Sequence, residues 1–202
     1  MKLVIRVGSF ISLLLFAGCA TSVKPNVASI AIPKAPAPIP VTVGISQVEQ
    51  KLNGGFSDLA LSVKKSLDES QVFKTIYYPV RQGDPLDGEI KLELSSKMKM
   101  DGAWFPKAFL TGFFMLLPSP FIEYHHRYQA ECTLGVIRRG QTLKTYSVTS
   151  SVTASHKLWM DSPEALEANA TQAATKLMAS QVAQELINDR AFLERELRGN
   201  AR

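Results

Sequence analysis

Alternation of apolar and polar residues is the clearest signal in this chain. Over residues 89–95, apolar side chains at every second position alternate with charged or hydroxyl side chains, which is typical of a strand with one buried face. The same period of two recurs over 128–136 and 146–152, and Arg138-Arg139-Gly140-Gln141 between them favours a turn. These segments predict a long antiparallel hairpin. Shorter segments at 41–45 and 71–80, rich in β-branched and aromatic residues, predict two more strands.

Two other segments repeat apolar residues at helical spacing. Ser57 is a suitable N-cap for a stripe over 59–67, and Ser162-Pro163-Glu164 opens a longer stripe over 166–187. Each stripe covers one side of its helix. We therefore predict an α+β fold, a small and mostly antiparallel sheet with a long hairpin and two amphipathic helices packed on one face. The domain is expected over 41–190, followed by a charged helical tail over 191–202.

Residues 108–117, AFLTGFFMLL, form an uncharged run that neither period explains. As a helix, ten residues cover about 15 Å, half of the hydrocarbon core of a bilayer, so the run is too short to span a membrane. It predicts either a buried core element or an exposed apolar segment that contacts a membrane or a partner protein. The residues for such a contact are Phe109, Phe113, Phe114, Met115, Leu116 and Leu117.

The amino terminus has the layout of a signal peptide. Lys2 and Arg6 precede an uncharged, largely apolar run over 7–17, followed by Gly18 and Cys19. The sequence over 15–19, LFAGC, resembles the lipobox of bacterial lipoproteins, with Phe16 where that family usually has Leu. The resemblance implies cleavage between Gly18 and Cys19, which leaves 1–18 as the signal peptide and makes Cys19 the acylated first residue.

The same resemblance implies a location. Ala20 follows the cysteine in place of the Asp that retains such proteins in the inner membrane. The expected site is the inner leaflet of the outer membrane, facing the periplasm, with membrane lipid bound through acylated Cys19. Several acyl chains on one cysteine make release negligible. No cofactor is expected apart from this covalent lipid.

Five of the eleven prolines lie between Ala20 and Pro40. Because proline lacks an amide donor and fixes its own φ, we expect residues 19–40 to form an extended tether rather than packed structure. At roughly 3 Å per residue it would hold the domain several nanometres from the membrane. The second cysteine, Cys132, lies in an alternating strand and is expected to be buried.

Charge and composition exclude several classes of protein. Removal of Lys2 and Arg6 lowers the formal net charge from +5 to +3, too little to indicate a nucleic-acid partner. Two cysteines do not make a disulfide scaffold. Glu123, His125, His126 and His156 are the only residues that could form a metal cluster. Because His125 and His126 point to opposite faces of a strand, no metal site is expected.

No catalytic motif stands out. Ser62-Val63-Lys64-Lys65 matches S-x-x-K, but the chain lacks the S-D-N and K-T-G motifs that accompany it in penicillin-recognising enzymes. The order of features over Val41–Asp189 resembles small bacterial envelope lipoproteins whose domain is similar to the amino-terminal domain of TolB. That resemblance implies a non-catalytic part of an envelope assembly.

Three functions remain open on sequence grounds, the last of them a small envelope hydrolase with Ser62 as its candidate residue. The first is a membrane-anchored, non-catalytic docking or assembly module of the cell envelope, with envelope proteins as partners. The second is a carrier for an acyl or other apolar ligand, with residues 109–117 lining its cavity. The oligomeric state is not determined by the sequence.

Overall fold

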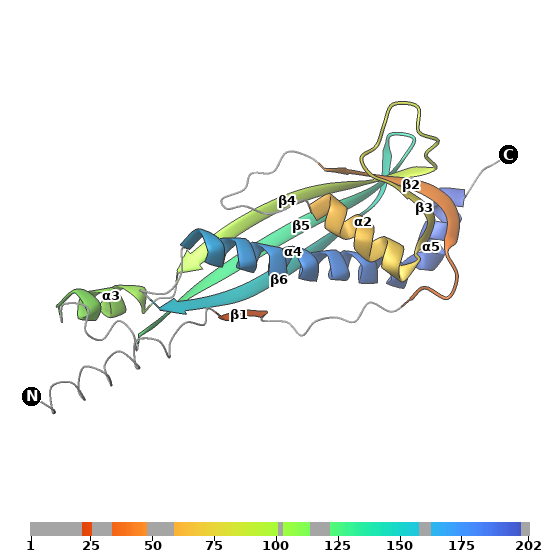
Figure 1. Ribbon diagram of the computed structural model, residues 1–202. Coiled ribbons are helices and arrows are strands. Elements are labelled where there is room, and N and C mark those ends of the chain that lie inside the picture. Colours follow the sequence, from red (N-terminus) through yellow and green to blue (C-terminus); the bar gives the residue numbers. More distant parts are fainter. Residues whose placement is uncertain are drawn as a thin grey trace, which may run out of the picture.

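A computed structural model describes residues 22–25, 34–47, 59–100, 103–113, 122–157 and 163–198 of the chain (Figure 1). The strands are β1 (Ser22–Pro25), β2 (Ile39–Gln47), β3 (Phe73–Tyr77), β4 (Gly88–Met100), β5 (Glu123–Arg138) and β6 (Gln141–Lys157). The helices are α2 (Leu59–Ser70), α3 (Trp104–Phe113), α4 (Pro163–Asn188) and α5 (Arg190–Arg198).

The strands form one mixed sheet in the order β1-β6-β5-β4-β2-β3. The pairs β1–β6, β6–β5 and β5–β4 are antiparallel, whereas β2 runs parallel to both β4 and β3. The hairpin of β5 and β6 pairs nearly all of its length, with one irregularity between Val136 and Ile137. The predicted α+β fold with a mostly antiparallel sheet and a long hairpin is confirmed.

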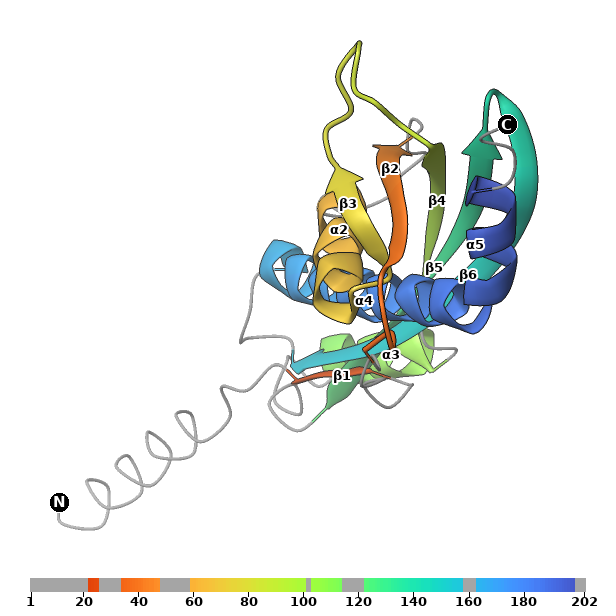
Figure 2. The ribbon, with the colours of Figure 1, turned by 90° about the vertical axis from the view of Figure 1, so that its right-hand side faces the viewer.

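Helices α2 and α4 lie side by side against one face of the sheet, and α5 follows α4 at the end of the molecule opposite α3 (Figures 1 and 2). The alternating apolar residues of β4, β5 and β6 point to this face and form the core with the helices. The fully buried side chains include Ile39, Ile45, Leu92, Leu134, Met178, Leu186 and Leu193. On the opposite face of the hairpin, side chains such as Arg127, Glu131 and Thr149 are exposed.

The prediction that residues 19–40 form an extended, unpacked tether is wrong for two segments. Residues 22–25 form β1 at the sheet edge, where a proline such as Pro25 is tolerated. The backbone N–H of Ala35 donates to the carbonyl of Ser70 at 2.8 Å, and the N–H of Ile39 donates to that of Val72 at 2.8 Å. Ile39 is fully buried. Proline content indicated an extended backbone, but it could not show that β6 and the end of α2 with the residues just after it offer hydrogen-bond partners to that backbone.

The charged tail expected from residue 191 is a helix as far as Arg198. Its two leucines, Leu193 and Leu197, are 0% and 2% exposed and belong to the core. Arg198 makes an ion pair with Glu194 one turn earlier on the outer side. The segment is therefore an amphipathic helix that closes one end of the domain.

Candidate functional site

The short helix α3 turns its apolar residues outward. Phe105, Phe109, Leu110 and Phe113 are 73%, 63%, 46% and 69% exposed, and we call these four residues the α3 patch. The three phenylalanines are spaced by four residues, which places them on one side of the helix. The rings of Phe109 and Phe113 stack with their centroids 5.9 Å apart. An amphipathic helix normally packs its apolar face against the core of its domain, whereas the apolar side chains of α3 are exposed.

The polar side of α3 fastens the helix to the sheet. The Lys107 ammonium donates a hydrogen bond to the carbonyl oxygen of Glu123, the first residue of β5, at 2.9 Å. Figure 1 shows α3 beyond the end of the long strands, at the opposite end of the molecule from α5. The apolar face is thus held away from the core that α2 and α4 cover.

Of the two interpretations of the run over 108–117, core filling is wrong for Phe109 and Phe113, which are mostly exposed. Phe114, Met115, Leu116 and Leu117 lie outside the described residues, as do Gly18 and Cys19. Phe105 and Leu110, which also belong to the patch, were not among the residues predicted from the sequence. The spacing of Phe105, Phe109 and Phe113 was the available signal, but it cannot show whether a helical stripe faces the core or the solvent.

Exposed cations lie on the sheet close to α3. Lys99 of β4 and Arg127 of β5 stand directly opposite each other in the antiparallel register, and both side chains are exposed. Glu123 is an exposed acid at the same end. None of the helices in the described part of the chain has the length and apolar character needed to cross a membrane.

The histidines lie near the same end of the hairpin. His126 and His156 stack with ring centroids 4.9 Å apart, and Tyr124 lies 5.6 Å from His156. Burial, and then the neighbouring His156 and His125, lower the pKa of His126. The described residues contain no group of three or more His, Cys, Asp or Glu side chains placed to hold a metal ion. The arrangement is a ring stack beside the buried Tyr124 and Tyr128.

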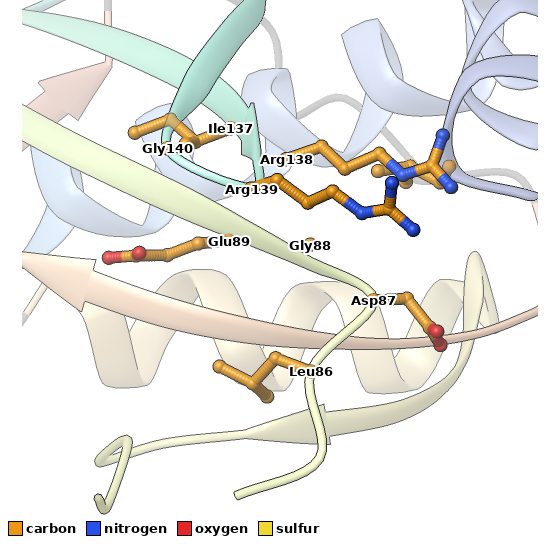
Figure 3. A pocket seen from close by; sticks show the side chains of 9 residues that line it. Leu86, Asp87, Gly88, Glu89, Ile137, Arg138, Arg139 and Gly140 are labelled. Atoms are coloured by element: carbon orange, nitrogen blue, oxygen red, sulfur yellow. The ribbon is translucent and has the colours of Figure 1, made fainter. Parts of the chain in front are cut away.

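A cavity of about 280 Å³ lies at the opposite end, where α5 meets the β5–β6 turn. Arg138 and Arg139 extend in the same direction, on the side where Asp87 lies, while Glu89 points the other way (Figure 3). Most of these groups already have partners within the fold. Asp87 accepts from the N–H of Thr42 at 2.7 Å, Glu89 accepts from the Ser46 hydroxyl, and Arg138 donates to the carbonyl of Glu196 at 2.5 Å. The cavity is thus a structural junction.

Comparison with known proteins adds a likeness in fold. No family model matches the sequence, and no curated protein matches it. A neuraminyllactose-binding hemagglutinin homolog from Helicobacter pylori is 9% identical, covers 83% of this chain and 96% of its own, and has a TM-score of 0.52. At this identity the likeness shows the fold alone.

Two further solved structures are lipoproteins by name. The minor lipoprotein from Acinetobacter baumannii is 11% identical, with 75% and 90% of the two chains covered and a TM-score of 0.43. Rare lipoprotein B from Shewanella oneidensis is 14% identical, with 78% and 98% covered and a TM-score of 0.36. None of the three structures is TolB, so the resemblance to its amino-terminal domain stays a prediction.

Proposed function

We propose that the protein is a lipid-anchored, non-catalytic docking module of the bacterial cell envelope. Cys19, cleaved from Gly18 and acylated, would anchor it in the inner leaflet of the outer membrane, facing the periplasm. The observation that carries the proposal is the α3 patch. A helix fastened to the sheet through Lys107, with three phenylalanines facing outward, is suited to contact another component of the envelope.

The proposal includes no reaction. Three polar side chains of the described cavity are used in hydrogen bonds: those of Asp87 and Glu89 join the start of β4 to β2, and that of Arg138 joins β5 to α5. Cys132 is fully buried, and burial raises the pKa of its thiol to about 12, so it is an inert core residue. Neither the cavity nor Cys132 provides an activated nucleophile or a free acid–base pair.

The alternative function, a carrier for an acyl or other apolar ligand, requires an enclosed apolar cavity beside residues 109–117. Phe109 and Phe113 instead face outward. The described cavity lies at the far end and is lined by charged residues such as Asp87 and Arg138. No observation on the described residues favours the carrier over the docking module.

A photo-crosslinking experiment in cells tests the docking module. A photoreactive residue replaces Phe109, and a matched control replaces Gln141, an exposed residue at the start of β6 and thus at the other end of the hairpin. We expect the Phe109 position to crosslink reproducibly to an envelope component, protein or lipid. The Cys19→Ser variant should give much weaker crosslinks, and intact mass measurement should show acyl chains on wild-type Cys19.

Two results would contradict the proposal. One is an unmodified Cys19 in the mature protein. The other is the same set of crosslinks from the Phe109 and Gln141 positions, because a docking surface confined to α3 predicts a difference between the two ends.

A further inference from the structure

The α3 patch lies close to the point where the chain enters the sheet. β1 begins at Ser22, which pairs with Ser155 of β6, and Ser155 in turn pairs with His125 of β5. Adjacent strands are about 4.8 Å apart, so Ser22 and His125 are separated by about 10 Å across the sheet. Glu123, whose carbonyl oxygen accepts a hydrogen bond from Lys107 of α3, is the first residue of β5 and lies two residues before His125. The attachment of α3 therefore lies within about 15 Å of Ser22.

Little chain separates this point from the proposed anchor. Cys19 precedes Ser22 by three residues, and three residues span at most about 11 Å even when fully extended. An acylated Cys19 would thus bring the α3 attachment to within about 25 Å of the membrane surface. The helix α3 is about 15 Å long. This length is of the same order as the distance between its attachment and the membrane surface.

We infer that the α3 patch binds the lipid surface of the membrane that holds Cys19, as a second, non-covalent membrane contact. This inference rests on the proposed lipid anchor and names the component that the patch contacts. The short helix would lie along the interface with Phe105, Phe109, Leu110 and Phe113 in the headgroup and acyl region, the usual position of an amphipathic interfacial helix.

Charge near α3 is consistent with a phospholipid surface. Lys99 and Arg127 are exposed and opposite each other on neighbouring strands, and anionic headgroups attract such cations. Glu123 at the same end opposes this attraction. The apolar contribution of the phenylalanines is therefore expected to dominate, and the salt dependence of binding should be weak.

Vesicle binding tests the inference without the covalent anchor. The mature chain carrying Cys19→Ser is mixed with vesicles of phosphatidylethanolamine and phosphatidylglycerol, and bound protein is measured by flotation. We expect measurable binding that falls at least about tenfold when Phe109→Ser and Phe113→Ser are added, because burial of one large apolar side chain is worth about a tenfold change. Leu61→Ser is the matched control, since Leu61 of α2 is 54% exposed and lies outside the patch.

A depth measurement on the acylated protein gives an independent readout. A fluorophore sensitive to its surroundings is attached at Phe109→Cys, with Gln141→Cys as control, while buried Cys132 stays unlabelled. In vesicles, we expect blue-shifted emission at position 109 that is quenched by lipids carrying a nitroxide on their acyl chains, and neither effect at position 141.

The two measurements have separate ways to fail. Equal vesicle binding by the double-serine variant and its parent, or a label at 109 that stays in water, overturns the lipid contact while leaving protein crosslinks at Phe109 intact. A blue shift without quenching by the lipid nitroxide means that a protein, such as a second copy of this chain, covers the patch. That result also overturns the lipid contact. Loss of acylation at Cys19 would instead contradict the anchor itself.

Discussion

At the residue scale, a single carboxylate connects the end of α4 with the long hairpin. Asp189 lies between α4 and α5, makes an ion pair with Lys144 and accepts a hydrogen bond from the Tyr146 hydroxyl at 2.7 Å. The hydrogen bond from Lys144, and then that from Tyr146, lower the pKa of Asp189. Burial, followed by the hydrogen bond to Asp189, raises the pKa of Tyr146. The three side chains fix where α5 begins relative to β6.

The lowered pKa of Asp189 predicts a pH-dependent loss of stability. Its ionised form favours the fold above the ordinary carboxyl pKa of about 4, and this contribution is lost as the pH falls through the lower native pKa. We expect Asp189→Asn to reduce the free energy of unfolding by about 0.5 to 1 kcal/mol near neutral pH, because the pair is partly exposed. The difference from wild type should shrink below about pH 4 in urea unfolding curves.

Asp68→Asn is the matched control for that experiment. Asp68 makes an exposed ion pair with Lys64 on α2, and such a pair is worth at most about 0.5 kcal/mol. An Asp189→Asn difference that is the same at neutral and acidic pH would contradict the assignment.

At the element scale, close approach of α5 to the sheet depends on a glycine. A Cβ on Gly88 of β4 would lie 2.7 Å from Leu197 Cδ2 and 3.2 Å from the carbonyl oxygen of Ile137. Leu197 is 2% exposed, and the Ile137 carbonyl belongs to the backbone of the paired strand β5, which cannot shift as the end of a side chain can. The absence of a side chain at Gly88 is what lets the last turn of α5 pack on β4.

Gly88→Ala is therefore expected to destabilise the domain by about 1 to 3 kcal/mol, the usual cost of adding an atom to a packed contact. Gly135→Ala is the control, because a Cβ there meets nothing within 4 Å, and its effect should stay within about 0.5 kcal/mol. Thermal melts of the two variants and wild type measure the difference. Equal melting temperatures for Gly88→Ala and Gly135→Ala would show that α5 does not pack as described.

The apolar face of α3 is exposed, whereas that of α5 is buried. Leu193 and Leu197 of α5 face the core and stabilise the fold, whereas Phe109 and Phe113 of α3 face outward. Substitutions in the α3 patch should accordingly change membrane or partner binding and leave the free energy of unfolding nearly unchanged.

At the scale of the whole molecule, the sheet has a covered face and an open polar face, and its two ends differ. One end carries β1, the α3 patch and the exposed Lys99 and Arg127. The other carries α5 and the cavity beside the β5–β6 turn. A lipid on Cys19 would therefore orient the domain, with the α3 end toward the membrane.

The core between the helices and the sheet should protect the thiol of Cys132. Cys132 is 0% exposed, and burial raises its thiol pKa to about 12, while the thiolate is the reactive form. We expect a thiol reagent such as Ellman's reagent not to react with the native protein at neutral pH, and to react stoichiometrically once urea unfolds it. Rapid reaction without denaturant would mean that the hairpin opens far more easily than its pairing indicates.

The fold was largely predictable because its elements have strong local patterns. The alternation through Leu92 and Leu134, the helical stripe of α4 and the turn at Gly140 each follow from near neighbours in sequence. The parallel placement of β2 beside β4 was not predictable, since it brings together strands separated by α2 and β3. The joining of β1 to β6 was missed for the same reason.

For the candidate site too, some features followed from the sequence and others only from the tertiary structure. Sequence alone determined that residues 108–117 are apolar and too short to span a bilayer, and it indicated the lipobox at Cys19. Only the tertiary structure decided that Phe109 and Phe113 face outward, that Phe105 joins them, and that β1 enters the sheet near α3. Periodicity specifies which residues share a face, but which face is buried depends on what packs against it, and those partners come from distant parts of the chain.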